Sequence, residues 1–131
     1  MDIAIGAAVL AGIGIWLYRR HVPARGMKLL NAAELPQLLC ADSSVQLLDV
    51  RDYLEYEAGH YPNAINISLG RLSLTWHKHL DKNKPVILLA SAPGEAYSAA
   101  RYLKRKGFRI DYWVICHASS QDCTVPHQCC A

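Results

Sequence analysis

The sequence predicts an α/β domain with a small parallel sheet flanked by helices, preceded by one N-terminal transmembrane helix. Three observations predict this architecture. Short apolar runs alternate with amphipathic stretches between residues 29 and 115, as expected for strands and helices of a parallel sheet. The run over residues 45–50 is almost continuously apolar, which is typical of a strand buried on both faces. An apolar segment over residues 3–18 stands ahead of this alternating region.

The composition allows one domain and argues against two classes of protein. A chain of 131 residues has room for one domain besides the apolar segment. Its net charge of +3 is mild and forms no basic stripe interleaved with aromatic residues, so we expect no nucleic-acid partner. The five cysteines are an odd number and four of them lie beyond residue 115, which is not the pattern of a disulfide framework. A reducing compartment fits this pattern better.

Residues 1–20 are predicted to form a transmembrane anchor. The apolar run over residues 3–18 is near the lower length limit for crossing a bilayer, and Trp16 and Tyr18 fall where interfacial aromatic residues gather. Arg19 and Arg20 follow the run, whereas a cleaved signal peptide has its basic residues first. The charge bias therefore predicts a single-pass protein with its N-terminus outside and its C-terminal domain in the cytoplasm. Membrane lipid is the expected partner of residues 3–18. A buried helix of a soluble domain is the alternative.

The chain after the anchor divides into a linker over residues 21–28, a domain over 29–115 and a Cys/His-rich tail over 116–131. We expect helices where apolar residues recur with helical spacing, and the first of them has Asn31 as its cap. The helix predicted over residues 69–80 is expected to have an apolar face formed by Leu72, Leu74 and Trp76. The predicted elements are a helix over 29–41, a strand over 45–50, a helical turn over 53–58, a strand over 64–67, a helix over 69–80, a strand over 86–89, a helix over 96–106 ended by Gly107, and a strand over 110–115.

The loop over residues 90–95 is the candidate site, because it joins a buried strand to a helix N-terminus. Free backbone N–H groups and the helix dipole attract anions at such a junction, and α/β proteins place ligands and nucleophiles there. The loop lacks Cys, His, Lys and Arg. It consists of Ala90, Ser91, Ala92, Pro93, Gly94 and Glu95.

Two parts of the sequence resemble the rhodanese-like domain family. The stretch LLDVRDYLEYEAGHYPNAINISL resembles the front half of such a domain, with its aspartate–arginine strand end, its acidic residue and its Gly-His-x-Pro-x-Ala-x-Asn turn. The strand, loop and helix over 85–108 resemble the family's active loop and the helix that follows it. Together the two parts cover roughly residues 27–114. The residues that match the motifs of the front half include Asp49, Arg51, Glu55, Gly59, His60, Pro62 and Asn66.

The resemblance implies a fold built for sulfur transfer through a cysteine persulfide, but it also implies that this chain has lost the reaction. An alignment without gaps puts Ala90 in the place of the nucleophilic cysteine and Glu95 where an arginine commonly sits. Pro93 replaces a loop glycine and so removes one N–H from the anion cradle. Asp49 and Arg51 are expected to form an internal ion pair, and His60 to make a structural hydrogen bond. Shifting the alignment by one residue brings Ser91 to the front, and a serine cannot carry sulfur.

The tail over 116–131 leaves three interpretations open. One is a metal site with Cys116, Cys123, His127 and Cys129 as ligands, although their spacing lacks the tight knuckles of structural zinc sites. Another is a displaced sulfur carrier, in which a tail cysteine reaches the loop. The third is a tail whose thiols have no set role, and under it we expect neither a metal nor a cofactor.

Three functions follow from these observations. The leading one is a membrane-anchored, catalytically degenerate rhodanese-like protein that acts as a binding or scaffolding module, with a protein partner in the membrane or at its cytoplasmic face. The alternative is a sulfurtransferase or sulfur carrier that uses a cysteine of the tail. The third is a small subunit of a membrane complex whose main contact is the apolar helix.

Overall fold

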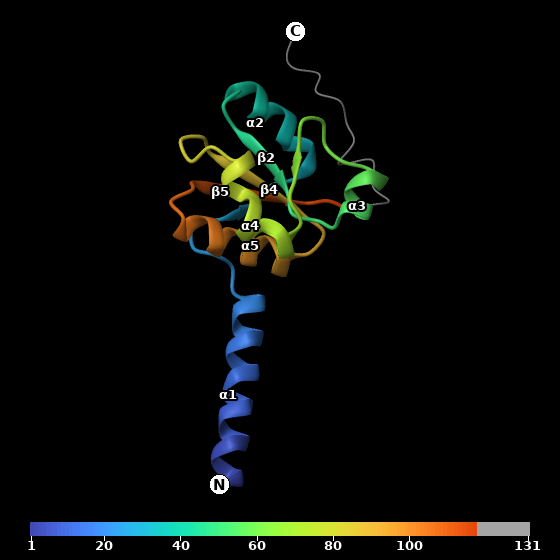
Figure 1. Ribbon diagram of the computed structural model, residues 1–131. Coiled ribbons are helices and arrows are strands. Elements are labelled where there is room, and N and C mark those ends of the chain that lie inside the picture. Colours follow the sequence, from blue (N-terminus) through green and yellow to red (C-terminus); the bar gives the residue numbers. More distant parts are fainter. Residues whose placement is uncertain (118–131) are drawn as a thin grey trace.

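A five-stranded, all-parallel sheet forms the centre of the protein (Figure 1). The computed structural model describes residues 1–117. The strand order is β1-β5-β4-β2-β3, so β4 lies in the middle with two strands on each side. The strands are β1 (Lys28–Leu29), β2 (Gln46–Asp49), β3 (Ile65–Asn66), β4 (Val86–Ala90) and β5 (Ile110–Ile115).

Helices cover both faces of this sheet, as the sequence predicts. Leu48, Leu88 and Trp113 belong to one apolar cluster, which they share with α4 and α5. Leu47, Leu89 and Val114 belong to a second cluster, which includes α2 and receives Tyr56 from α3. The alternation of neighbouring strand residues between two clusters is the signature of a sheet buried on both faces. The helices are α1 (Asp2–His21), a 3-10 turn η1 (Ala32–Glu34), α2 (Leu35–Ala41), α3 (Tyr53–Ala58), α4 (Leu69–His79) and α5 (Pro93–Arg105).

Helix α1 stands clear of the domain, and only its C-terminal end approaches α5 (Figure 1). Residues 3–21 are long and apolar enough to cross a membrane by length and composition, with a mean hydropathy of 1.4, and the domain buries none of them. Large apolar side chains therefore face outward along the helix, including Ile3, Leu10 and Ile15. This exposure distinguishes α1 from the core helix of a soluble domain, although a signal sequence has the same properties.

The helix predicted over 29–41 is wrong at its start. Lys28, placed at the end of the linker, and Leu29 instead form β1, and Leu29 pairs with Trp113 of β5. The chain then turns, and the side chain of Asn31 accepts a hydrogen bond from the backbone N–H of Ala33 at 3.1 Å. The predicted cap is therefore present, but it caps the 3-10 turn that precedes α2. Two-residue edge strands carry too little apolar periodicity to be recognised in a sequence.

Three further expectations need correction. Helix α5 begins at Pro93 and not at Ala96, because proline is well suited to a first helical turn, where its missing N–H has no partner to lose. Ala90 is the last residue of β4 and pairs with Ile115, so the loop proper consists of Ser91 and Ala92. In α4, Leu72 is buried whereas Leu74 is 70% exposed, since residues two apart on a helix face different directions.

Candidate functional site

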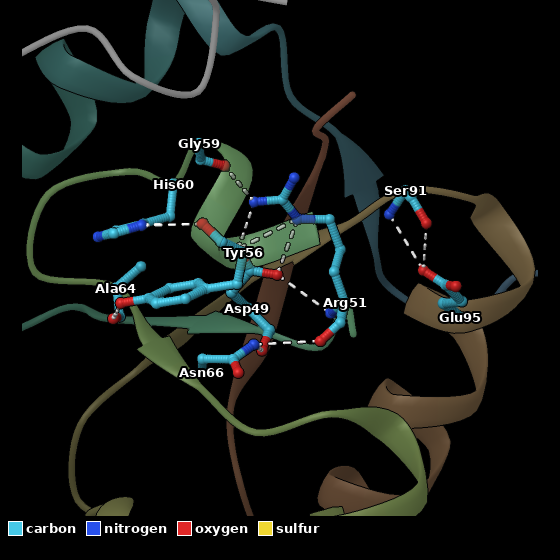
Figure 2. Close-up of polar contacts among 9 residues, drawn as sticks. All are labelled: Asp49, Arg51, Tyr56, Gly59, His60, Ala64, Asn66, Ser91 and Glu95. Atoms are coloured by element: carbon cyan, nitrogen blue, oxygen red, sulfur yellow. Dashed lines mark hydrogen bonds and ion pairs between the residues drawn. The ribbon is translucent and has the colours of Figure 1, made fainter. Parts of the chain in front are cut away.

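A fully buried ion pair closes the C-terminal end of β2. Arg51 Nη2 lies 2.7 Å from Asp49 Oδ2, and Arg51 Nε donates to both carboxylate oxygens at 3.0 and 3.2 Å. The backbone N–H of Arg51 donates to Asp49 Oδ1 at 3.0 Å. Both side chains have no exposed surface. The ion pair expected from the sequence is therefore present, with both carboxylate oxygens engaged (Figure 2).

This ion pair also fixes the segments on either side of it. Arg51 Nη2 donates to the carbonyl oxygen of Gly59 at 2.9 Å, which holds the end of α3 against β2. Asn66 Nδ2 donates to the carbonyl oxygens of Asp49 and Arg51 at 3.2 and 3.1 Å. Arg51 Nη1 finds no acceptor in the described part of the chain. Asp49, Arg51, Gly59 and Asn66 thus form one network, and their roles in it are structural.

His60 also has a structural place. Its ring stacks on Tyr56 with centroids 3.9 Å apart, and its Nδ1–H donates to the carbonyl oxygen of Tyr56 at 2.9 Å. The Tyr56 hydroxyl in turn donates to the carbonyl oxygen of Ala64 at 3.0 Å. Burial raises the pKa of the Tyr56 phenol, and the negative charge of Asp49 adds to the rise. The phenol therefore stays protonated at neutral pH and ties α3 to the segment before β3.

The loop after β4 is closed by its own carboxylate. Glu95 Oε2 accepts one hydrogen bond from the Ser91 backbone N–H at 3.0 Å and another from Ser91 Oγ at 2.9 Å (Figure 2). Glu95 lies in the first turn of α5, where the helix dipole favours a negative charge. The Ser91 N–H, which could bind an external anion, therefore already donates to the carboxylate of Glu95.

The Ala90 side chain is fully buried at the base of this loop. It belongs to the same apolar cluster as Ala96 and Ala99 of α5. The carbonyl oxygen of Ala90 accepts a hydrogen bond from the Cys116 backbone N–H at 2.8 Å, so the end of the described chain leaves the sheet beside this residue. Cys116 itself is fully buried, whereas Cys123, His127 and Cys129, the other residues of the predicted metal set, lie outside the described residues.

A large cleft opens beside the loop. It has a volume of about 1340 Å³ and lies between the C-terminal end of α1, the chain that follows it, and α5 along its length from Pro93 to Arg105. Ala92, Pro93, Gly94 and Glu95 line its inner end. A Cβ added at Gly94 would lie 3.3 Å from Cγ of Arg20, so the absence of a side chain at residue 94 allows this close approach of α1.

Two predicted residues lie apart from the loop. Pro62 lines a smaller cavity on the other side of β2, together with Leu39 and Gln46. Glu55 is half-buried in the first turn of α3. The structure thus brings four of the seven motif residues into the Asp49–Arg51 network and places His60 beside it. The sequence did not predict the cleft residues of α1, because it carries no signal for the contact between the end of an N-terminal helix and the domain that follows it.

A protein-family model described as "Rhodanese-like domain" matches residues 31–116 of the chain. This range takes in β2 to β5, the ion-pair network and the loop. It leaves α1 and β1 outside the match.

Two curated proteins are similar to parts of the chain. The "Putative sulfur carrier protein YrkF" of Bacillus subtilis is 29% identical over 87 residues, which are 60% of this chain and 46% of that protein. The tRNA uridine(34) hydroxylase of Buchnera aphidicola is 29% identical over 80 residues, which are 57% of this chain and 26% of that protein. The chain therefore spans less than half the length of either relative.

Solved structures show the same architecture. A rhodanese-related protein from Thermoplasma volcanium matches with a TM-score of 0.58 and 26% identity, over 70% of this chain and 87% of that one. A Bacillus halodurans protein, BH2092, matches with a TM-score of 0.58 and 26% identity, over 68% of this chain and 66% of that one. The sheet and its helices are therefore shared with these proteins.

The buried ion pair makes a prediction about stability. Replacing Asp49 by Ala leaves the Arg51 guanidinium buried without its counter-ion, so we expect the free energy of unfolding to fall by roughly 3–5 kcal/mol. The measurement is a urea titration of the full chain, followed by circular dichroism. Asp111→Ala is the matched control, because it removes the exposed Arg109–Asp111 pair and should leave the free energy of unfolding almost unchanged. Equal losses in the two variants would contradict a structural role for the buried pair.

Proposed function

This chain belongs to the rhodanese-like domain family, and from that premise we propose that it is a membrane-anchored, catalytically degenerate member that acts as a binding or scaffolding module. One observation carries the proposal. The loop that would hold the reacting sulfur has Ala90 at its base and is closed by a hydrogen-bonded carboxylate, Glu95.

Ala90 supplies no group that could form a persulfide. A sulfur-transfer nucleophile must be a thiolate, held at low pKa by N–H dipoles and neighbouring cations. Alanine has neither a thiol nor a hydroxyl, and the next residue, Ser91, has its hydroxyl bonded to Glu95. Since Ala90 is fully buried against α5, its position in the fold is that of a packing residue.

Glu95 disfavours an anionic substrate at the same place. An anion that accepted a hydrogen bond from the Ser91 N–H would lie next to the Glu95 carboxylate. Two like charges about 4 Å apart repel by roughly 4 kcal/mol near a protein surface. A hydrogen bond to a charged group contributes only about 1.5–3 kcal/mol. The repulsion therefore outweighs the gain, and thiosulfate is excluded unless Glu95 moves away.

Helix α1 supports the membrane part of the proposal. The apolar run over residues 3–18 lies outside the domain core, and the basic residues Arg19, Arg20 and Arg25 come after it. A bilayer would cover the exposed apolar side chains, and the charge bias favours a cytoplasmic domain. The domain would then lie against the membrane surface at the end of α1.

The enzymatic half of the proposal is tested by an activity assay. We expect the full chain in mild detergent to form no thiocyanate from thiosulfate and cyanide. The double variant Ala90→Cys, Glu95→Arg adds a thiol and removes the repelling carboxylate. Its thiolate should attack the outer sulfur of thiosulfate, break the S–S bond and release sulfite, so residue 90 should gain one sulfur atom, about 32 Da. The measurement is mass spectrometry of the proteolytic peptides.

The matched control for this gain is Ala90→Cys alone, which keeps Glu95 and should acquire sulfur more slowly. If the wild-type chain forms thiocyanate, and still does so after all tail cysteines are replaced by serine, the proposal of a catalytically degenerate domain is refuted. An equal rate of sulfur uptake by the single and double variants would refute the role given to Glu95.

The membrane half has its own test. We expect the full chain to remain in the membrane fraction after washing with high salt and alkaline carbonate, because an apolar span is held by the hydrocarbon core and not by surface charge. Replacing Ile5, Val9 and Ile13 by Asp should release it. Extraction of the unmodified chain by alkaline carbonate would contradict the anchor.

A second candidate function is a sulfur carrier that uses a cysteine of the tail. The hydrogen bond between Cys116 N and the Ala90 carbonyl oxygen favours it, because the tail begins beside the loop. The name of the Bacillus subtilis relative also points in this direction. The peptide masses of the wild-type chain decide between the two functions, since sulfur on Cys116, Cys123, Cys129 or Cys130 would support the carrier.

A further inference from the structure

The cleft between α1 and α5 is strongly basic. Its lining includes six Arg and Lys side chains and His21, against a single carboxylate, Glu95. The Glu95 carboxylate bonds to Ser91 and forms no ion pair with these cations among the described residues, so one negative charge faces six positive ones. The six cations come from both sides of the cleft and are Arg19, Arg20, Arg25, Arg101, Lys104 and Arg105.

These cations have no acidic partners in the part of the chain that the structure describes. The ion pairs found among residues 1–117 are Asp49–Arg51 and Arg109–Asp111, and neither reaches the cleft. Arg101, at the centre of the group, has its pKa lowered by burial and further by the charges of Arg19 and Arg105. Like charges thus lie close together without compensation, which is the arrangement of a site for an anion.

Two of the cations fix the shape of the cleft. The Arg101 guanidinium donates to the carbonyl oxygens of Val22, at 2.8 Å, and of Arg19. Lys104 Nζ donates to the carbonyl oxygen of Arg25. These bonds satisfy carbonyl groups at and beyond the end of α1, where cations also complement the helix dipole. Arg101 and Lys104 therefore hold α1 against α5, and Arg25 and Arg105 are exposed at the cleft with their charges available.

The cleft also has an aromatic side. Trp16 and Tyr18 line it, and both are more than half exposed. The guanidinium of Arg20 lies 5.4 Å from the centre of the Trp16 ring. Trp and Tyr side chains at the end of an apolar helix favour the headgroup level of a bilayer. Along α1 the lining of the cleft therefore changes from aromatic, at Trp16 and Tyr18, to basic, at Arg19 and Arg20. This order matches the change from hydrocarbon to headgroup in a bilayer.

We propose that this cleft binds the phosphate headgroup of anionic phospholipids and so fixes the rhodanese-like domain against the membrane surface. The inference rests on the proposed membrane anchor, because α1 must bring the cleft to the headgroup level. Clusters of four to eight Lys and Arg at the cytoplasmic end of a membrane helix are typical of binding to anionic lipids. A soluble phosphate would match the charges but would make no use of Trp16 and Tyr18.

The test uses the full chain in vesicles of phosphatidylcholine brominated in the acyl chains, which quench the fluorescence of Trp16. Phosphatidylserine or phosphatidylcholine without bromine then replaces part of the quenching lipid, and the recovery of fluorescence gives the relative affinity for the two headgroups. We expect phosphatidylserine to be preferred by about tenfold. In Arg25→Gln, Arg105→Gln the preference should fall to within about twofold, because two exposed charges are lost while the bonds that hold α1 remain.

The matched control is Lys78→Gln, Lys84→Gln, which removes two exposed charges outside the cleft and should keep the full preference. An equal fall in this control would overturn the proposal, since the effect would then follow net charge. A second outcome would also overturn it. If inorganic phosphate abolishes the preference and chloride at the same ionic strength does not, the cleft binds a soluble anion. A chain that stays inserted but prefers neither lipid contradicts this inference alone, whereas a chain that fails to insert contradicts the anchor as well.

Discussion

The buried pair of Asp49 and Arg51 is the interaction on which the arrangement of the site depends. A carboxylate and a guanidinium without exposed surface are stable only because each is also bonded to the backbone, and those bonds reach the end of α3. Asn66 bonds to the carbonyl oxygens of the same two residues and fixes β3 beside β2. A buried pair of this kind contributes little net stability over apolar packing, but removing one partner is costly. Its consequence here is geometric, because it fixes the strand end that neighbours the loop after β4.

The loop after β4 is closed by a carboxylate from the helix that follows it. The backbone N–H of Ser91 lies two residues before α5, and the carboxylate of Glu95 in the first turn of α5 accepts its hydrogen bond. The carboxylate accepts the Ser91 N–H and lies in the first turn of α5, where the helix dipole favours a negative charge. The same end of α5 contacts the last turn of α1, where Gly94 faces Arg20. The loop, the basic cleft and the proposed membrane surface are therefore adjacent, which suits a module that presents one face to a membrane.

Much of the fold could be predicted from the sequence, because apolar runs and turn residues report burial directly. The strand over 110–115 and the helix over 53–58 have the predicted bounds, and the motif around Asp49 and Arg51 indicated both the family and the ion pair. Edge strand β1 could not be predicted, since its two residues are exposed and depend on pairing with β5. The bond between Glu95 and Ser91 was also missed. A separation of four residues makes it possible, but only the start of α5 at Pro93 brings the two side chains together. The packing of α1 on α5 depends on tertiary contacts of Arg101 and Lys104, which have no periodic signal.

The central claim is that Glu95 occupies the anion position of the loop, and one measurement tests it most directly. The backbone amide resonance of Ser91 can be followed by NMR while sulfate is titrated at constant ionic strength. In the wild-type chain we predict no saturable shift, because the Ser91 N–H already bonds to the Glu95 carboxylate. In Glu95→Ala that N–H is open and the like charge is gone, so a saturable shift should appear. A saturable shift of Ser91 in the wild-type chain would contradict the account, since the loop would then bind anions with Glu95 in place.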